Sequence, residues 1–547
     1  MLAIRWFLLL AVIAAPAAAQ LVESIEVKIT NVEVVVTDRS GKPVHGLTRE
    51  DFEIVEGGKP QPITNFYEVR ADQPPARTAE ADAESDDVVA EERRQRKIIV
   101  FIDNTSLEPH RRNVAMKEIG AALDALMRPG DDAMVAMWDR RMRVLQPFTT
   151  DASEVRRVIN SSASFAGGGP LMAAEKQRVL STVQDLLASA RQSRGRGRSI
   201  ADAYRESISI ARAYAESLFV STRGLLGGMR QMITTLSGLE GRKVLIMVGG
   251  ELQQRPGLDV LEQVNSIFAP YGVGVPSMLT SDTDRTLVTD LEKVIRVSAG
   301  SGVSMYMIDA ADRSGSKINA TGDEDAFAEF IGSTGTFLTM GQLADATGGR
   351  AISGSSSYQT VLDELERDLG SYYSLGYRAT SDTGMKSVRV RVRTPGLRVR
   401  SRKFIMHKTT HEQMEDRVVS NVFHRRGEGD FPVTITTAPP QRDGRNYKID
   451  VRVEFPSTLT YLPDGASLAG EFGIYFVVAS RDGALSPVSS TVKPVKFAAA
   501  DAAAIYAMPF HFTTTVVVRP GEQTVSVAVI DRVDGRAGFG TADIVAR

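Results

Sequence analysis

The sequence predicts an α/β protein: a doubly wound parallel sheet, flanked by an N-terminal β-unit and a C-terminal β-sandwich. In the middle of the chain, continuous apolar runs such as Ile98–Ile102, Val244–Val248 and Val303–Ile308 are separated by segments with helical periodicity. Such runs are typical of parallel strands that helices cover on both faces. Toward both ends of the chain, apolar and polar residues alternate between turn residues, which is typical of antiparallel sheets.

The composition is that of a globular protein with several domains. The chain has 547 residues, of which 43% are hydrophobic and 24% charged, and its formal net charge is −2. Domains commonly have ~100–200 residues, so we expect several of them. The small net charge gives no bias toward polyanions, and we expect no nucleic-acid partner. The absence of cysteine excludes disulfides, thiolate metal sites and cysteine nucleophiles.

Residues 1–19 have the pattern of a secretory signal peptide. Arg5 precedes an apolar run over Trp6–Ala15, and Ala17–Ala19 form a small-residue cleavage site. The apolar run is shorter than the ~20 residues that a transmembrane helix needs. We therefore expect cleavage before Gln20, export to the periplasm or the medium, and no transmembrane anchor after cleavage. An uncleaved N-terminal anchor is the alternative.

The segments that follow predict a small β-unit and a linker. Within residues 20–70, alternation places Val32, Val34 and Val36 on one face of a strand. Residues 71–96 are first acidic and then basic, with few apolar side chains to bury. We interpret them as a solvated, charged linker.

Residues 97–380 form the predicted α/β domain. Its first strand ends in Asp103, and Pro109 suits the first turn of the helix that follows. A helical insertion at about 163–220 interrupts the sheet pattern and contains the basic loop Arg191–Arg198. We interpret this loop as solvated, with binding of an anionic partner as the alternative.

A basic β-hairpin at 381–410 and a β-sandwich-like domain at 430–547 complete the predicted organisation. Period-two alternation places six arginines on the outer faces of the two hairpin strands. They are Arg389, Arg391, Arg393, Arg398, Arg400 and Arg402. One explanation is a solvated face that prevents edge-to-edge pairing. The alternative is that this face docks an anionic surface, such as the acidic linker residues 79–92 or an envelope polyanion.

Five phrases occur in order over about residues 24–406. They are VVVTDRSGKPVHGLTREDFEIVEGGKPQPI, RKIIVFIDNTSL, GRKVLIMVGGE, LADATGGRAI and SYYSLGYRAT. In these phrases the chain resembles the VWFA-related (von Willebrand factor A-like, vWA) domain family that is abundant in acidobacterial genomes. The resemblance implies a Rossmann-like vWA fold that binds a protein or ligand, often through a divalent metal ion. In that family a D-x-S-x-S loop after the first strand holds the metal, with a threonine and an aspartate on neighbouring loops.

Carried onto this chain, the family's metal site is degenerate. Asp103 and Thr105 match the loop, but Leu107 replaces its second hydroxyl. Thr222 falls where the neighbouring threonine is expected, and Glu251, displaced by one residue, replaces the aspartate. Oxygen ligands of this kind suit Mg²⁺ or Mn²⁺. The alternative is that Asp103 only ends its strand and caps the following loop.

The remaining candidate chemistry is weak. His407, His411 and His424 have a spacing that zinc ligands can have, but no HExxH acid accompanies them and their segment shows no apolar face. We interpret them as surface histidines. The sequence has no nucleophile elbow, phosphate-binding loop or dinucleotide fingerprint. We therefore expect a binding protein for adhesion or scaffolding rather than an enzyme. A structural envelope module with an inert site and an uncharacterised hydrolase are the alternatives.

Mass spectrometry of the protein isolated from its native host tests the export prediction. Because a signal peptide is removed at its small-residue site, the mature chain is expected to begin at Gln20. A chain that keeps Met1 and fractionates with membranes would contradict this prediction.

Overall fold

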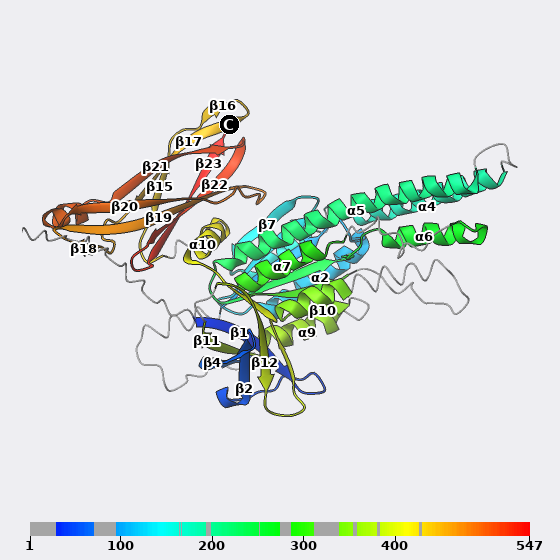
Figure 1. Ribbon diagram of the computed structural model, residues 1–547, viewed down its shortest axis with the longest axis horizontal. Helices are drawn as coiled ribbons and strands as arrows, with labels where there is room; N and C mark the ends of the chain where they lie inside the picture. Colours follow the sequence, from blue (N-terminus) through cyan, green and yellow to red (C-terminus); the bar gives the residue numbers. More distant parts are fainter. Residues whose placement is uncertain are drawn as a thin grey trace, which may run out of the picture.

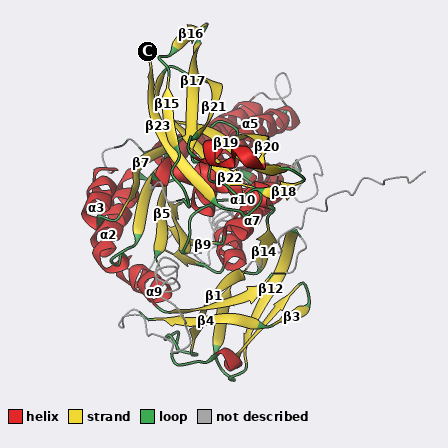
Figure 2. Cartoon of the chain, turned by 90° about the vertical axis from the view of Figure 1, so that its left-hand side faces the viewer, coloured by secondary structure: helices red, strands yellow, loops and turns green. Residues whose placement is uncertain are grey.

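The computed structural model contains an α/β domain that lies between two β units (Figures 1 and 2). The predicted signal peptide, and the predicted linker up to residue 94, lie outside the described residues. Within the described part of the chain, no helix combines the length and the apolar character that crossing a membrane requires. The structure describes residues 29–70, 95–162, 165, 167–192, 199–250, 252–273, 286–310, 338–353, 358–379, 383–425 and 429–547.

The centre of the α/β domain is a six-stranded sheet with the order β10-β9-β8-β5-β6-β7. Its strands are β5 (Arg96–Asp103), β6 (Asp132–Trp138), β7 (Met142–Thr149), β8 (Arg242–Gly249), β9 (Val303–Asp309) and β10 (Arg350–Ser353). All neighbours pair in parallel except β7, which runs antiparallel to β6. Counted from β5, the order is 3-2-1-4-5-6, so the chain reverses its direction of winding between β5 and β8.

Helices cover both faces of this sheet because β5 is apolar on both. Ile98, Val100 and Ile102 belong to one core, and Ile99 and Phe101 belong to the other. The helices are α2 (Pro109–Leu126), α3 (Ala152–Ser161) and α9 (Tyr358–Gly370) on the first face, and α5 (Ile200–Ser237) and α7 (Val288–Ser301) on the second. The predicted doubly wound α/β arrangement is therefore present, although its edge strand β7 is antiparallel.

The predicted helical insertion forms a long arm that extends from the sheet (Figure 1). It consists of α4 (Gly169–Gln192), the N-terminal part of α5 and, alongside them, α6 (Leu258–Phe268). These helices have their own apolar core, which includes Val183, Ala211 and Phe268. Helix α5 continues without a break to Ser237, because its C-terminal half buries a second apolar face against the sheet.

One of the two β units, here called the split β unit, is built from chain segments that precede and follow the α/β domain in sequence. One sheet has the order β13-β1-β11-β4 and the other β14-β12-β2-β3. The strands are β1 (Ile29–Thr37), β2 (Phe52–Glu56), β3 (Lys59–Gln61), β4 (Ile63–Val69), β11 (Tyr372–Arg378), β12 (Gly384–Val392), β13 (Arg398–Ser401) and β14 (Phe404–His407). Val34 and Ile54 from the first segment share one core with Leu375 and Val390 from the second.

The split β unit corrects two predicted boundaries. Strand β11 was expected inside the domain 97–380, but it pairs with β1 and β4. The segment 381–410 was expected to be one hairpin. The start of β12 does pair antiparallel with β14, but the rest of β12 pairs with β2, and the expected return strand β13 pairs with β1 in the opposite sheet. The physical reason is burial, since the alternating valines of each segment need an apolar layer that only the other segment supplies.

A helix and a C-terminal β-sandwich follow. Helix α10 (Thr410–His424) places Met414, Val418 and Val422 between α5 and the sandwich, so the expectation that this segment has no apolar face is wrong. The sandwich has two antiparallel sheets around one core, as the sequence predicts. Its strands are β15 (Thr434–Thr437), β16 (Gln441–Asp443), β17 (Asn446–Phe455), β18 (Leu462–Asp464), β19 (Ser467–Ser480), β20 (Ser489–Ala498), β21 (Phe510–Val518), β22 (Gly521–Asp531) and β23 (Ala537–Ala546), with the short helix α11 (Ala502–Tyr506).

Truncation of Leu375 tests the split β unit. Leu375 is fully buried in β11 between β1 and β4, so Leu375→Ala should destabilise the unit by about 2–5 kcal/mol. Hydrogen exchange measured by mass spectrometry should become faster in residues 29–37 and 63–69, which are more than 300 positions away in sequence.

The matched control is Leu462→Ala, because Leu462 is 44% exposed in the C-terminal sandwich. A substitution at such a site is expected to change stability by about 0.5 kcal/mol or less. Faster exchange confined to residues 372–378 in the Leu375 variant would contradict the topology.

Candidate functional site

The candidate site lies at the carboxyl ends of β5 and β8, where the strand order reverses. Strand β5 ends in Asp103 and β8 ends in Gly249, and their parallel register places these two residues side by side. Gly249 is in turn the register partner of Asp309, the last residue of β9. The three residues thus form a row across three strands, with the two carboxylates roughly 10 Å apart at their Cα atoms.

The loop after β5 folds tightly around the carboxylate of Asp103, which is 1% exposed. Its Oδ1 accepts hydrogen bonds from the Thr105 backbone N–H (2.9 Å) and hydroxyl (2.6 Å). Its Oδ2 accepts one from the Ser106 hydroxyl (2.6 Å). Burial raises the pKa of Asp103, and the hydrogen bonds from Ser106 and Thr105 offset only part of that rise.

Ser106 also connects the two strands. Its hydroxyl oxygen accepts a hydrogen bond from the backbone N–H of Gly250 at 2.9 Å, while the same hydroxyl donates to Asp103. The ends of β5 and β8 are therefore joined through one side chain. These two bonds use the hydroxyl's donor and one of its two acceptor positions, and this fixes its orientation.

Glycines allow a second segment to close over the loop. The Gly168 N–H donates to the Asn104 carbonyl at 2.7 Å. A Cβ atom at Gly168 would lie 2.9 Å from the Cα of Thr105, a distance at which the backbone has to shift. A glycine is required at this position because the two backbones are in direct contact.

A buried arginine supports the loop from the side of α2. Arg112 is 1% exposed, and its guanidinium donates to the Asn104 side chain and to the Phe165 carbonyl (2.7 Å). Burial lowers the pKa of Arg112, and Asp139 opposes that effect. The loop is thus held by Arg112, by the glycine turn and by the Gly250 N–H.

The sequence-predicted metal ligands have different outcomes. Asp103 and Thr105 lie together, as expected. Thr222 was expected in a loop, but it lies within α5, where its hydroxyl donates to the Leu218 carbonyl at 2.9 Å. The position was counted back from Gly241 on the expectation of a loop before the strand, and this fails because α5 continues through Thr222 to Ser237. Glu251 lies outside the described residues.

Two residues of the site were missed from the sequence. Ser106 supplies the second hydroxyl, whereas Leu107 is buried in the core. The tight turn brings consecutive hydroxyls to Asp103, while the family pattern looks at every second residue. Asp309 is 1% exposed and follows the apolar run of β9 as Asp103 follows that of β5, and this parallel could have revealed it.

The donor set suits a hard divalent cation in kind, since it consists of carboxylate and hydroxyl oxygens. In number it is small: the described residues contain no group of three or more His, Asp or Glu side chains placed to hold a metal ion. Any cation at this edge would therefore depend on hydroxyl, backbone and water oxygens for most of its ligands.

The six arginines do not share one face. Arg389, Arg391, Arg393 and Arg398 are exposed, the first two on the outer side of β12. Arg400 forms an ion pair with Asp368 of α9 at 2.5 Å. Arg402 is 9% exposed and contacts Glu33 and the Gly302 carbonyl. The expectation of six outward arginines is wrong for the last two, because β13 faces the α/β domain.

The three histidines that raised a zinc alternative lie against separate partners. His407 contacts Glu56, His411 contacts Tyr475 at 3.0 Å, and His424 contacts Asp132 at 3.0 Å. Each interaction joins different elements of the fold, so these side chains do not converge on a common ligand.

Comparison with known proteins gives structural neighbours alone, because no family model and no curated protein matches the chain. One neighbour is a von Willebrand factor type A protein from Catenulispora acidiphila, which is 10% identical to this chain. The match spans 83% of this chain and 67% of that protein, with a TM-score of 0.23. The conserved hypothetical protein BatB from Bacteroides thetaiotaomicron is 13% identical, and the match spans 50% of this chain and 98% of BatB, with a TM-score of 0.22. An aerotolerance-related membrane protein from Bacteroides fragilis is 12% identical, and the match spans 50% of this chain and 98% of that protein, with a TM-score of 0.23. Likenesses this low carry no argument about function.

Replacing Ser106 tests the connection between the strands. Ser106→Ala removes a donor to Asp103 and an acceptor for Gly250, and should lower the free energy of unfolding by about 1–3 kcal/mol. Denaturant unfolding followed by circular dichroism measures the change. The control is Ser181→Ala, since Ser181 is exposed on α4 and donates only to the Arg178 carbonyl. Equal effects of the two substitutions would show that the connection is unimportant.

Proposed function

We propose that this chain is an exported binding protein whose α/β domain recognises a protein partner at the carboxyl edge of its sheet. The observation that carries the proposal is the position of the Asp103–Ser106 loop, between β5 and β8. In open α/β sheets, the point where the strand order reverses leaves a crevice at the carboxyl ends of the strands, and ligands bind there.

A divalent cation, Mg²⁺ or Mn²⁺, completes the proposed site. Asp103, Thr105 and Ser106 are the residues that would hold it, with Asp309 on the other side of Gly249. A bound cation would supply open coordination positions for a carboxylate of the partner. Gly249 lies between the two carboxylates without a side chain of its own, and a Cβ atom there would lie 3.0 Å from the Met247 methyl group and 3.5 Å from the Asp103 Cβ.

The chain's own contribution is a rigid loop. The hydroxyls of Thr105 and Ser106 already point at Asp103, and the Gly168 N–H and Arg112 hold the loop backbone and Asn104. A site that is ordered before binding loses little conformational entropy when a ligand arrives. This favours recognition of a partner over a purely structural role for the loop.

A structural module is the second candidate function, because one apolar core runs across domains. Leu236 of α5, Val418 of α10 and Ile530 of β22 belong to the same cluster, so the α/β domain and the C-terminal sandwich are firmly joined. Such a chain could hold other components at a fixed distance with its carboxyl edge inert. The two candidates differ in whether a cation binds.

Cation titration separates them. Mg²⁺ or Mn²⁺ should raise the melting temperature of the full chain, since a ligand that binds only the folded state adds about 2.7 kcal/mol at one hundred times its Kd. Asp103→Ala should abolish this gain, and Asp309→Ala should reduce it. Differential scanning fluorimetry at constant ionic strength provides the measurement.

Two controls accompany the titration. Thr222→Ala should leave the gain unchanged because its hydroxyl is occupied within α5. Asp443→Ala removes an exposed carboxylate of the sandwich and should also leave it unchanged. If the wild-type chain shows no gain at millimolar cation, the inert structural module is the better account.

A further inference from the structure

We propose that the junction between the split β unit and the α/β domain is a binding site for a small multivalent anion, one that carries at least two phosphate or carboxylate groups. The site is a cavity of about 470 Å³, and neither Asp103 nor any other residue of the carboxyl edge lines it. It is therefore separate from the proposed cation site.

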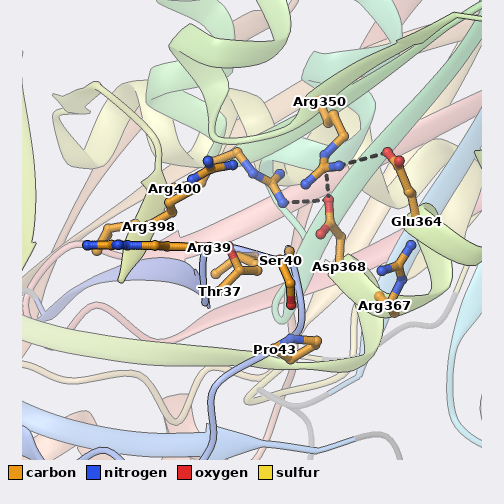
Figure 3. Close-up of a pocket in the computed structure, with 13 residues that line it drawn as sticks. Thr37, Arg39, Ser40, Pro43, Arg350, Glu364, Arg367, Asp368, Arg398 and Arg400 are labelled. Carbon is orange, nitrogen blue, oxygen red and sulfur yellow. Dashed lines mark hydrogen bonds and ion pairs between the residues drawn. The ribbon is translucent and has the colours of Figure 1, made fainter. Parts of the chain in front are cut away.

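Five arginines from four chain segments line this cavity, here called the arginine pocket. Arg39 comes from the turn after β1, Arg350 from β10, Arg367 from α9, and Arg398 and Arg400 from β13. Figure 3 shows Arg350 and Arg400 turned toward Asp368, with Arg39 and Arg398 together on one side of the cavity. No continuous stretch of sequence encodes this cluster.

The acids of the pocket compensate only part of the charge. Glu364 pairs with Arg350 at 2.7 Å. Asp368 pairs with Arg400 at 2.5 Å and lies 3.5 Å from Arg350. The lining therefore contains five guanidinium groups and two carboxylates, which gives the pocket a formal charge of +3.

The remaining three arginines are at the mouth of the pocket. Arg39, Arg367 and Arg398 are exposed, and among the described residues none of them forms an ion pair with an acid. The Arg367 Nε donates to the Asp363 carbonyl at 3.0 Å, which leaves its terminal nitrogens available. Like charges gathered at one site repel each other, so a ligand of opposite charge gains favourable interactions with all three.

The chemistry of the pocket selects the class of ligand. A guanidinium presents planar, paired N–H donors that match the oxygens of phosphate and carboxylate groups. The three arginines that form no ion pair can bind more than one phosphate or carboxylate group. The cavity is also larger than a single inorganic phosphate requires. The ion pairs with Glu364 and with the buried Asp368 orient Arg350 and Arg400, so this part of the site is ordered in advance.

A bound anion would join two units of the fold. Arg39 and Arg398 belong to the split β unit, whereas Arg350 and Arg367 belong to the α/β domain. Binding would therefore stabilise the junction itself, and the affinity should fall as salt rises because the mouth arginines are exposed to solvent.

Isothermal titration calorimetry of the full chain with pyrophosphate and with citrate tests the site. We expect one ligand per chain. The double variant Arg39→Gln/Arg398→Gln should weaken binding at least tenfold. The matched control is Arg389→Gln/Arg391→Gln, which removes the same charge from the outer face of β12, outside the pocket. It should change the affinity less than twofold.

The two probes identify the ligand chemistry, since tighter binding of pyrophosphate indicates phosphate groups and tighter binding of citrate indicates carboxylates. Circular dichroism verifies that each variant is folded. The proposal is overturned if neither probe binds at millimolar concentration, or if both double variants weaken binding equally, which would indicate diffuse surface charge. Asp103→Ala should bind the anion normally, so this result is independent of the carboxyl edge.

Discussion

The pairing of β4 with β11 is the constraint on which the arrangement of the chain depends. Val69 at the end of β4 lies opposite Tyr372 at the start of β11, so the chain leaves the split β unit and returns to it at neighbouring positions. The whole α/β domain is thus inserted between two adjacent strands. An insertion between neighbouring chain positions is compatible with a folded host, and here both ends of the inserted domain are fixed by one sheet.

The return point is stabilised by arginines that cap α9. Arg96 donates to the Leu369 carbonyl (3.2 Å), Arg128 to the Gly370 carbonyl (3.1 Å) and Arg242 to the Asp368 carbonyl (3.1 Å). The last carbonyls of a helix have no partner within it and carry partial negative charge, so three cations there satisfy and stabilise the end. Arg242 also lies 4.1 Å from the ring centroid of Tyr372, the first residue of β11. The junction that holds the arginine pocket is therefore rigid on the side of the α/β domain.

How far the sequence could predict this structure depends on whether a residue's partner is local. Strand β5 and helix α5 could be predicted because their own apolar patterns determine which faces are buried. The alternating valines of β12 indicated a strand, but nothing in them shows that the partner is β2, more than 300 residues earlier. Adjacency in sequence suggested a hairpin; that pairing is present between β12 and β14, whereas burial of the valines places β13 in the other sheet, beside β1.

The same distinction explains the candidate site. Asp103 and Thr105 are local to one turn, and the sequence placed them together. Thr222 was placed by counting back from Gly241 to an expected loop, but α5 continues through that position, so Thr222 lies in the interior of a helix. Ser106 depended on the geometry of the turn rather than on spacing.

Charge follows a similar rule, because a net value says nothing about where charges gather. The formal net charge of −2 gives no bias toward polyanions, yet folding brings five arginines and two acids to one cavity from segments that are scattered in sequence. At the carboxyl edge, folding aligns two buried aspartates, Asp103 and Asp309, on either side of a glycine. The fold thus separates an acidic site at the switch point of the sheet from a basic one at the domain junction. The two proposed sites share no residue, so the cation and the anion that we propose for them would not compete for the same side chains.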